Sequence, residues 1–202
     1  MAEWFKQYWY LALIFVGVCI VAAVIFYFAG KSYSAYRASY RKQEEEIKRL
    51  TALKSRFVPL TEEAIAKSDS GETLEGVALS YQLRLQKQED MEKEFSLMTE
   101  EKRYIYILDV FVADKSVDEF FRQNGDILRS EITAAFRLIG MTEFAEKIEE
   151  IRKMFDPEDE VTSLDEKKIE AVQKYADDNS VIEGIKLKSA EFIKANSQLF
   201  VN

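Results

Sequence analysis

The sequence predicts an all-α protein with a single N-terminal transmembrane helix, an amphipathic juxtamembrane helix and a compact multi-helix soluble domain. Three observations predict this class. An uncharged apolar stretch lies near the N-terminus. The apolar residues after it recur at helical spacing between residues that start and stop helices. No two segments alternate as paired strands do. We therefore expect an anchor over residues 1–30, a juxtamembrane helix over 31–58 and a soluble domain over 61–202.

The anchor is predicted by Trp9–Ala29, twenty-one residues without a charged side chain. As a helix this stretch is roughly 30 Å long, which matches the hydrocarbon core of a bilayer. Gly17, Ala22 and Ala23 are small enough to allow another helix to approach closely. A cleaved signal peptide is the alternative, but its apolar region is shorter and ends in small residues, whereas this stretch ends in bulky ones. The aromatic residues expected at the two membrane interfaces are Trp9, Tyr10, Phe26, Tyr27 and Phe28.

The flanking charges predict the orientation of the anchor. Lys31, Arg37, Arg41 and Lys42 follow the span, and the first acid after it is Glu44. Cytoplasmic flanks are rich in Lys and Arg, so we expect a single-pass protein of the cell inner (plasma) membrane with its C-terminal domain in the cytoplasm. The same four cations suit contact with lipid headgroups.

The juxtamembrane helix carries a heptad of alternating three- and four-residue spacing. Gln43 and Lys54 are its polar members. The spacing fits either a short parallel coiled coil, formed with another copy or another membrane protein, or a helix that packs its apolar face on its own domain. The apolar members form a candidate helix-pairing seam of Tyr33, Tyr36, Tyr40, Ile47, Leu50 and Phe57.

Composition removes several classes of chemistry. The chain has no histidine, and its one cysteine is Cys19 in the apolar stretch, so His-based catalysis, His-ligated metals and intramolecular disulfides are excluded. A calcium loop starting at Asp156 fails because Val161 and Lys167 occupy its sixth and twelfth positions. We expect no catalytic residue, no metal and no cofactor. An enzyme that uses carboxylates alone, such as Asp109 in a hydrophobic segment, is the minor alternative.

Charge is unevenly distributed along the chain. Residues 1–60 hold nine Lys/Arg against four Asp/Glu, and residues 61–202 hold nineteen against thirty-two. An acidic domain of this kind is repelled by nucleic acid and attracted to basic proteins. We therefore expect no direct nucleic-acid binding and consider a basic protein as a partner. The candidate acidic partner surface consists of Glu158, Asp159, Glu160, Asp177 and Asp178.

Capping residues and apolar spacing predict the helices of the soluble domain. Thr61, Thr73, Thr99 and Thr142 are expected to start helices, and Asn124-Gly125 and Gly140 are expected to end them in the left-handed conformation. The predicted helices cover residues 62–67, 74–96, 100–112, 117–123, 128–139, 144–155, 164–177 and 181–199.

Four elements follow one another in the C-terminal part of the chain: the hydrophobic helix Tyr104 to Val112, Phe120-Phe121 before Asn124-Gly125, Ala134-Ala135 before Ile139-Gly140, and Ile148 to Phe155. Through these elements this part, roughly residues 95–202, resembles the bacterial DNA-mimic protein family and its uncharacterised relatives. The resemblance implies an all-helical acidic domain, and in the founding mimics the carboxylates imitate DNA phosphates to occupy a DNA-binding protein. One departure is Asp114-Lys115-Ser116, where family members usually carry Asn-Gly-Gly.

These observations predict a membrane-anchored, non-enzymatic interaction or scaffold protein, a subunit or accessory factor of a membrane-associated complex. Membrane lipid, another membrane protein and a second copy of the chain are the expected partners. The alternative is a membrane-tethered acidic domain that, like a DNA mimic, binds a basic DNA-binding protein.

Overall fold

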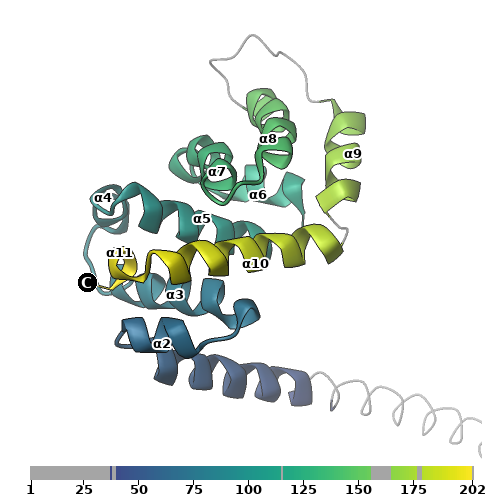
Figure 1. The fold of residues 1–202 in the computed structure, drawn as a ribbon. Coiled ribbons are helices and arrows are strands. Elements are labelled where there is room, and N and C mark those ends of the chain that lie inside the picture. The colour runs from purple at the N-terminus through teal and green to yellow at the C-terminus, as the bar shows by residue number, and fades with distance from the viewer. Residues whose placement is uncertain (1–36, 38–39, 115, 156–164, 177–178, 202) are drawn as a thin grey trace, which may run out of the picture. The chain divides into compact units, whose positions relative to one another are not determined.

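The structure is a computed structural model that describes residues 37, 40–114, 116–155, 165–176 and 179–201 (Figure 1). Every regular element in these ranges is a helix, which confirms the all-α prediction. The chain divides into two compact units, Met1–Thr51 and Ala52–Asn202. The predicted anchor, Trp9–Ala29, lies outside the described residues. Among the described helices, none is both long enough and apolar enough to cross a membrane.

Residues 40–57 are helical without interruption and end before Val58-Pro59, as the sequence predicts because a residue that precedes proline resists the α conformation. Leu53 and Phe57 from the end of this helix belong to the core of the second unit. The remaining helices, in chain order, are α2 (Glu62–Lys67), α3 (Ser70–Leu85), α4 (Met91–Ser96), α5 (Glu100–Ala113), α6 (Val117–Gln123), α7 (Asp126–Leu138), α8 (Thr142–Phe155), α9 (Glu166–Ala176), α10 (Asn179–Ala195) and α11 (Ser197–Phe200).

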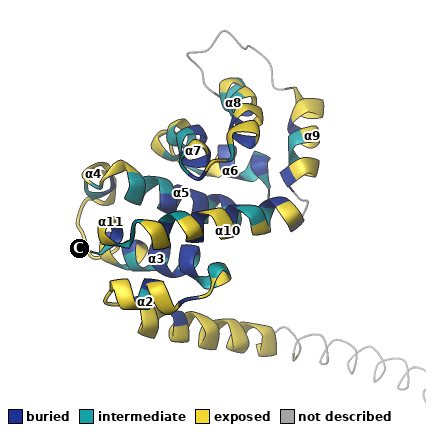
Figure 2. Ribbon diagram, in the orientation of Figure 1, coloured by how far each residue is buried: buried dark blue, intermediate teal, exposed yellow. Residues whose placement is uncertain are grey.

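Within the second unit, α3, α5 and α10 form the centre of the fold. The long helix α10 packs along α3 and also contacts α5, and α5 in turn supports α7 (Figure 1). Helix α8 packs on α7, and α9 contacts α6 and α8. Helices α2 and α11 contact each other beside α10. The buried residues line the surfaces where these helices meet, and exposed residues cover the outer faces (Figure 2).

Phenylalanine rings join four of these helices. The ring of Phe111 on α5 meets Phe120 of α6, Phe136 of α7 and Phe144 of α8 at centroid distances of 5.3, 5.1 and 5.9 Å, each edge to face. All four rings are buried. Such edge-to-face pairs add about 0.5–1.5 kcal/mol each beyond the area that they bury. The paired aromatics that the sequence places before Asn124 are therefore core residues.

The predicted single helix over residues 74–96 is wrong, because the structure has two helices there. The first starts earlier, since the Asp69 carboxylate, not Thr73, accepts the capping hydrogen bond from the Glu72 amide at 2.8 Å. It ends at Leu85, where a run of polar residues leaves no apolar side chain to bury. A new helix begins after Asp90, whose carboxylate accepts from the Lys93 amide at 3.0 Å.

Two other helix ends also differ from prediction. Neither Asn124 nor Gly125 is left-handed, with φ of −92° and −69°, and Gly125 instead stands at the N-cap of α7. The predicted last helix over 181–199 is divided, because α10 ends at Ala195 and the short α11 follows Asn196. The prediction for Gly140 is confirmed, since its φ is +73°.

Candidate interaction site

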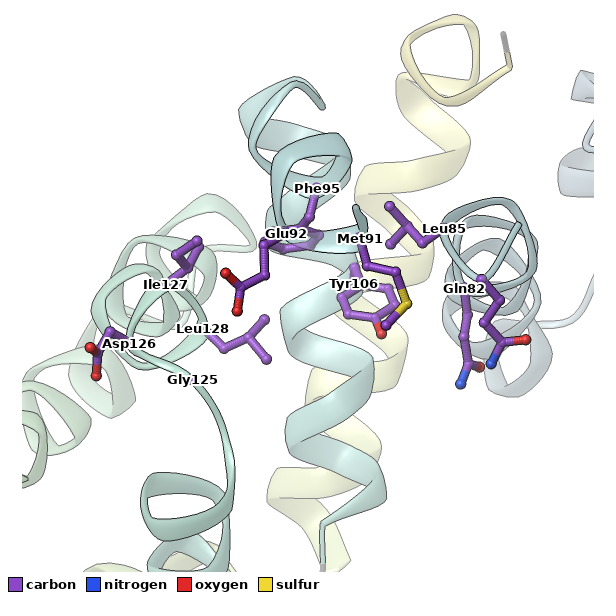
Figure 3. A pocket seen from close by; sticks show the side chains of 11 residues that line it. Gln82, Leu85, Met91, Glu92, Phe95, Tyr106, Gly125, Asp126, Ile127 and Leu128 are labelled. Atoms are coloured by element: carbon purple, nitrogen blue, oxygen red, sulfur yellow. The ribbon is translucent and has the colours of Figure 1, made fainter. Parts of the chain in front are cut away.

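A groove of about 560 Å³ lies between the end of α3, the short helix α4, the middle of α5 and the start of α7 (Figure 3). Its volume falls in the range of sites that hold a ligand or a few side chains of a partner. The residues that line it are Gln82, Leu85, Gln86, Met91, Glu92, Phe95, Tyr106, Gly125, Asp126, Ile127 and Leu128.

The base of the groove is apolar and aromatic. Phe95 of α4 and Tyr106 of α5 meet edge to face with centroids 5.5 Å apart, and Leu85 of α3 is buried beside them. Burial raises the pKa of the Tyr106 phenol, and the negative charge of Asp109 raises it further. The phenol therefore stays neutral at physiological pH and offers a partner one polar atom within an apolar surface.

The charge on the groove has one sign. Two carboxylates line it, those of Glu92 and Asp126, and no Lys or Arg does. The Asp126 carboxylate pairs with Arg129 of its own helix, and its side chain is almost fully exposed. In Figure 3 the Glu92 carboxylate lies between the Ile127 and Leu128 side chains of α7 and the Tyr106 ring of α5. Because Asp126 is already paired, Glu92 is the carboxylate that would attract a cation into this groove.

Arg103 of α5 connects the elements that form the groove. Its Nε and Nη2 atoms donate to the two oxygens of Glu131 on α7 at 2.9 and 2.8 Å, and its Nη1 donates to the Met98 carbonyl just after α4 at 2.8 Å. Both side chains of the ion pair are mostly buried. A two-point contact of this kind fixes geometry as well as adding energy. The spacing of α4, α5 and α7 is therefore set before any partner arrives.

Two large apolar side chains are exposed at the ends of α4. Met91, its first residue, is 55% exposed at the groove, and Leu97, its C-cap, is 70% exposed. Leu97 lines a second hollow of about 170 Å³, together with Arg84 and Lys102. Burial lowers the pKa of Lys102, and the neighbouring charge of Arg84 lowers it further. The groove is thus lined by two acids, whereas this second hollow is lined by two cations and one acid, Glu94.

The side chains around the groove are suited to binding. They supply two amides, two carboxylates, one neutral phenol and a set of apolar groups. Within the described ranges, no group of three His, Cys, Asp or Glu side chains is placed to hold a metal ion.

Most residues for which the sequence predicts a function lie away from the groove or outside the described part of the chain. Of the predicted topology residues, Arg37, Arg41 and Lys42 are helical and exposed. The residues of the predicted seam differ in burial: Tyr40, Ile47 and Leu50 are exposed, whereas Phe57 is fully buried in the core of the second unit. The residues outside the described ranges are the anchor residues, Lys31, Tyr33, Tyr36 and all five acids of the predicted partner surface, Glu158, Asp159, Glu160, Asp177 and Asp178.

Sequence reasoning missed the groove. The one local signal was Asp90, which caps α4 and so turns a polar stretch into a short helix that presents Met91. Tyr106 carries no such signal, since its place at the base of the groove depends on Phe95 and on the start of α7, both distant from it along the chain.

Comparison of the chain with models of protein families, with curated proteins and with solved structures gave no match. The resemblance of residues 95–202 to the DNA-mimic family therefore stays a prediction from sequence motifs.

Proposed function

We propose that this protein is a membrane-anchored interaction protein whose helical domain binds a protein partner through the groove between α3, α4, α5 and α7. The observation that carries the proposal is an apolar groove that bears acids and no cations, formed by helices that Arg103 holds in place. The anchor rests on the uncharged stretch Trp9–Ala29, and the cytoplasmic orientation rests on the cations that follow it. The activity is binding, without catalysis.

The chemistry of the groove indicates the kind of partner segment that it accepts. Apolar side chains of the partner would cover the exposed surfaces of Met91 and Ile127. Complete burial of such a side chain from water contributes about 1.5–3 kcal/mol, and these two residues, 55% and 37% exposed, would gain the corresponding part of it. A Lys or Arg next to them would meet Glu92. The fitting segment is therefore a basic, amphipathic stretch of a membrane-associated protein, such as one face of a helix.

Site-specific photo-crosslinking in membranes tests this proposal. A photoreactive amino acid at Met91 is expected to give a discrete crosslinked band, because this side chain is exposed at the groove. The same amino acid at Leu187, which is 48% exposed on α10 and does not line the groove, is the control and is expected to give none. Identical bands from both positions would refute the groove as the binding site.

A charge reversal separates the contribution of the groove from that of the acidic domain as a whole. Glu92→Lys is expected to abolish the Met91 crosslink, and Glu191→Lys on the exposed surface of α10 is expected to leave it unchanged. Removal of residues 1–30 tests the anchor separately. We expect this deletion to move the protein from the membrane fraction to the soluble fraction without disturbing the helical domain.

One observation favours the DNA-mimic alternative. Glu143, Glu146 and Glu150 lie along one exposed face of α8 at helical spacing, so their charges form a row. A mimic would bind its basic partner through such rows, and its affinity would fall steeply between low and moderate salt. The groove proposal expects a shallower salt dependence, because apolar burial contributes much of the affinity. Sensitivity of partner binding to a triple Glu→Gln change on α8, with no effect of Glu92→Lys, would establish the mimic instead.

A further inference from the structure

The helical residues 40–51 carry a row of exposed apolar side chains. Tyr40, Ile47 and Leu50 are 59%, 64% and 37% exposed, and Gln43 falls at the remaining position of the same spacing. Single exposed apolar residues are ordinary, but three at the a and d positions of consecutive heptads lie on one face of the helix. We refer to Tyr40, Gln43, Ile47 and Leu50 as the pairing row.

The residues that flank the pairing row are already neutralised within their own helix. Glu44 pairs with Lys48 at 2.7 Å, and Glu46 pairs with Arg49 at 2.8 Å. These two acids occupy the e and g positions, which face each other when two such helices lie side by side. Because each acid has a cation on its own helix, two identical helices can approach without strong repulsion between their flanks.

We propose that the pairing row binds the same row of a second copy of this chain, parallel and in register. Gln43 decides between the two orientations. In a parallel pair it meets Gln43 of the other copy, and the two amides can hydrogen-bond to each other. In an antiparallel pair it would face apolar side chains and leave its amide unpaired, which is costly. A polar residue at one core position of a coiled coil typically sets register in this way.

The pairing row ends at Leu50. The next positions of the heptad are Lys54, whose charge opposes burial, and Phe57, which is fully buried in the core of the second unit. In the other direction Tyr36 and Tyr33 continue the spacing in the sequence. The pairing row itself spans roughly one and a half heptads, which is short for a stable coiled coil in solution. Its stability therefore rests in part on the proposed membrane anchor, which confines two copies in one plane and raises their effective concentration.

Disulfide trapping of the full-length protein in membranes tests the pairing. The sole cysteine is first removed with Cys19→Ser, and single cysteines are then introduced as Tyr40→Cys, Ile47→Cys and Leu50→Cys, all of which keep Gln43. All three are expected to form same-position disulfide dimers on mild oxidation, because a parallel in-register pair brings each residue to its counterpart. The control, Glu45→Cys, lies on the opposite face of the helix and is expected to remain monomeric. Dimers from only one of the three pairing-row positions would indicate an antiparallel pair. Dimers that form equally well from Glu45→Cys would indicate random collision. Either result overturns the proposal.

A second variant tests whether the apolar side chains of the pairing row provide the free energy of dimerisation. Ile47→Glu is expected to abolish dimers in crosslinking and sizing without loss of folding, since Ile47 is largely exposed. Separating the full-length samples into membrane and soluble fractions distinguishes this inference from the proposed anchor. If the full-length protein is in the soluble fraction and still gives disulfides specific to the pairing row, the anchor proposal is refuted and the pairing proposal is supported. If the protein is in the membrane fraction and gives no disulfide specific to the pairing row, the pairing proposal is refuted and the anchor proposal is supported.

Discussion

The ring of Phe57 lies directly against the backbone of Gly76 in α3. A Cβ atom at position 76 would overlap three atoms of that ring. The ring is fully buried, and the neighbouring Arg56 forms an ion pair with Glu72 one turn earlier in α3. Glycine at position 76 is therefore required for the close approach of the segment 52–57 to α3, although glycine is a poor helix former.

Gly76→Ala is expected to destabilise the second unit by about 1–3 kcal/mol, because the added methyl group forces the Phe57 ring out of its site. Gly184→Ala in α10 is the matched control: nothing lies within 4 Å of the Cβ that it adds. That change should be neutral or stabilise by up to about 1 kcal/mol through helix propensity. Urea unfolding of a fragment that lacks residues 1–30 measures both. Equal stability of the two variants would show that the Phe57 contact is not tight.

Asp90→Ala is expected to weaken α4 by about 1 kcal/mol, because it removes the carboxylate that accepts from the Lys93 amide. The effect should be local, so hydrogen exchange at the amides of α4 should accelerate while exchange in α5 stays unchanged. Thr99→Ala provides the comparison, since Thr99 occupies the N-cap of α5 without making a side-chain capping bond. If both variants accelerate exchange alike, the Asp90 cap has no special role in holding the groove.

Arg103→Lys is expected to cost about 1–2 kcal/mol of stability, because a lysine ammonium cannot contact both oxygens of Glu131 and the Met98 carbonyl in the same geometry. The same change at Arg122, whose ion pair with Asp118 is about half exposed and whose guanidinium lies 5.5 Å from the centroid of the Phe155 ring, should cost less stability. Thermal unfolding compares the two. We also expect Arg103→Lys to weaken the Met91 crosslink, and an unchanged crosslink would mean that this contact does not define the shape of the groove.

Glu149 links stability to pH. Hydrogen bonds from Arg152 and Thr133 hold the pKa of its carboxyl at about 2, despite the opposing effect of burial. The pKa is lower in the folded state than in the unfolded chain, so the charged form stabilises the fold above about pH 5, and this contribution is lost as the pH falls toward 2. Glu149→Gln should therefore lower the free energy of unfolding by about 1–2 kcal/mol at pH 7, after allowance for partial exposure. The difference from the wild type should vanish near pH 2; a gap that is constant across pH would instead indicate a packing effect.

Much of the helical architecture could be predicted from the sequence because helix starts and stops are local. Thr61 caps α2 as expected, accepting from the Ala64 amide at 3.1 Å. Helix α6 covers the predicted residues, and Gly140 takes the left-handed conformation that ends a helix. The failures concern competition between neighbouring signals. Asp69 rather than Thr73 starts α3, and a cap at Asp90 divides a stretch whose composition favours helix throughout.

The candidate site could not be predicted in the same way. Sequence charge directs attention to acids such as Glu158 and Asp177, which lie outside the described residues. The groove depends instead on Glu92, Tyr106 and Ile127, three residues that lie on separate helices and share no motif. Nothing in the local pattern distinguishes Tyr106 from Tyr104. Only the positions of α4 and α7 place Tyr106 in the groove.

The sequence by itself determined the helical class, most helix boundaries to within a few residues, the absence of histidine chemistry and the prediction of a membrane anchor, because each of these depends on the composition or spacing of nearby residues. Only the tertiary structure decided that Phe57 of the heptad is buried while Tyr40, Ile47 and Leu50 are exposed. It also decided that an acidic, apolar groove forms where α3, α4, α5 and α7 meet. The physical reason is that burial depends on contacts between segments distant in the chain, and the same amphipathic pattern can meet its own domain or a partner.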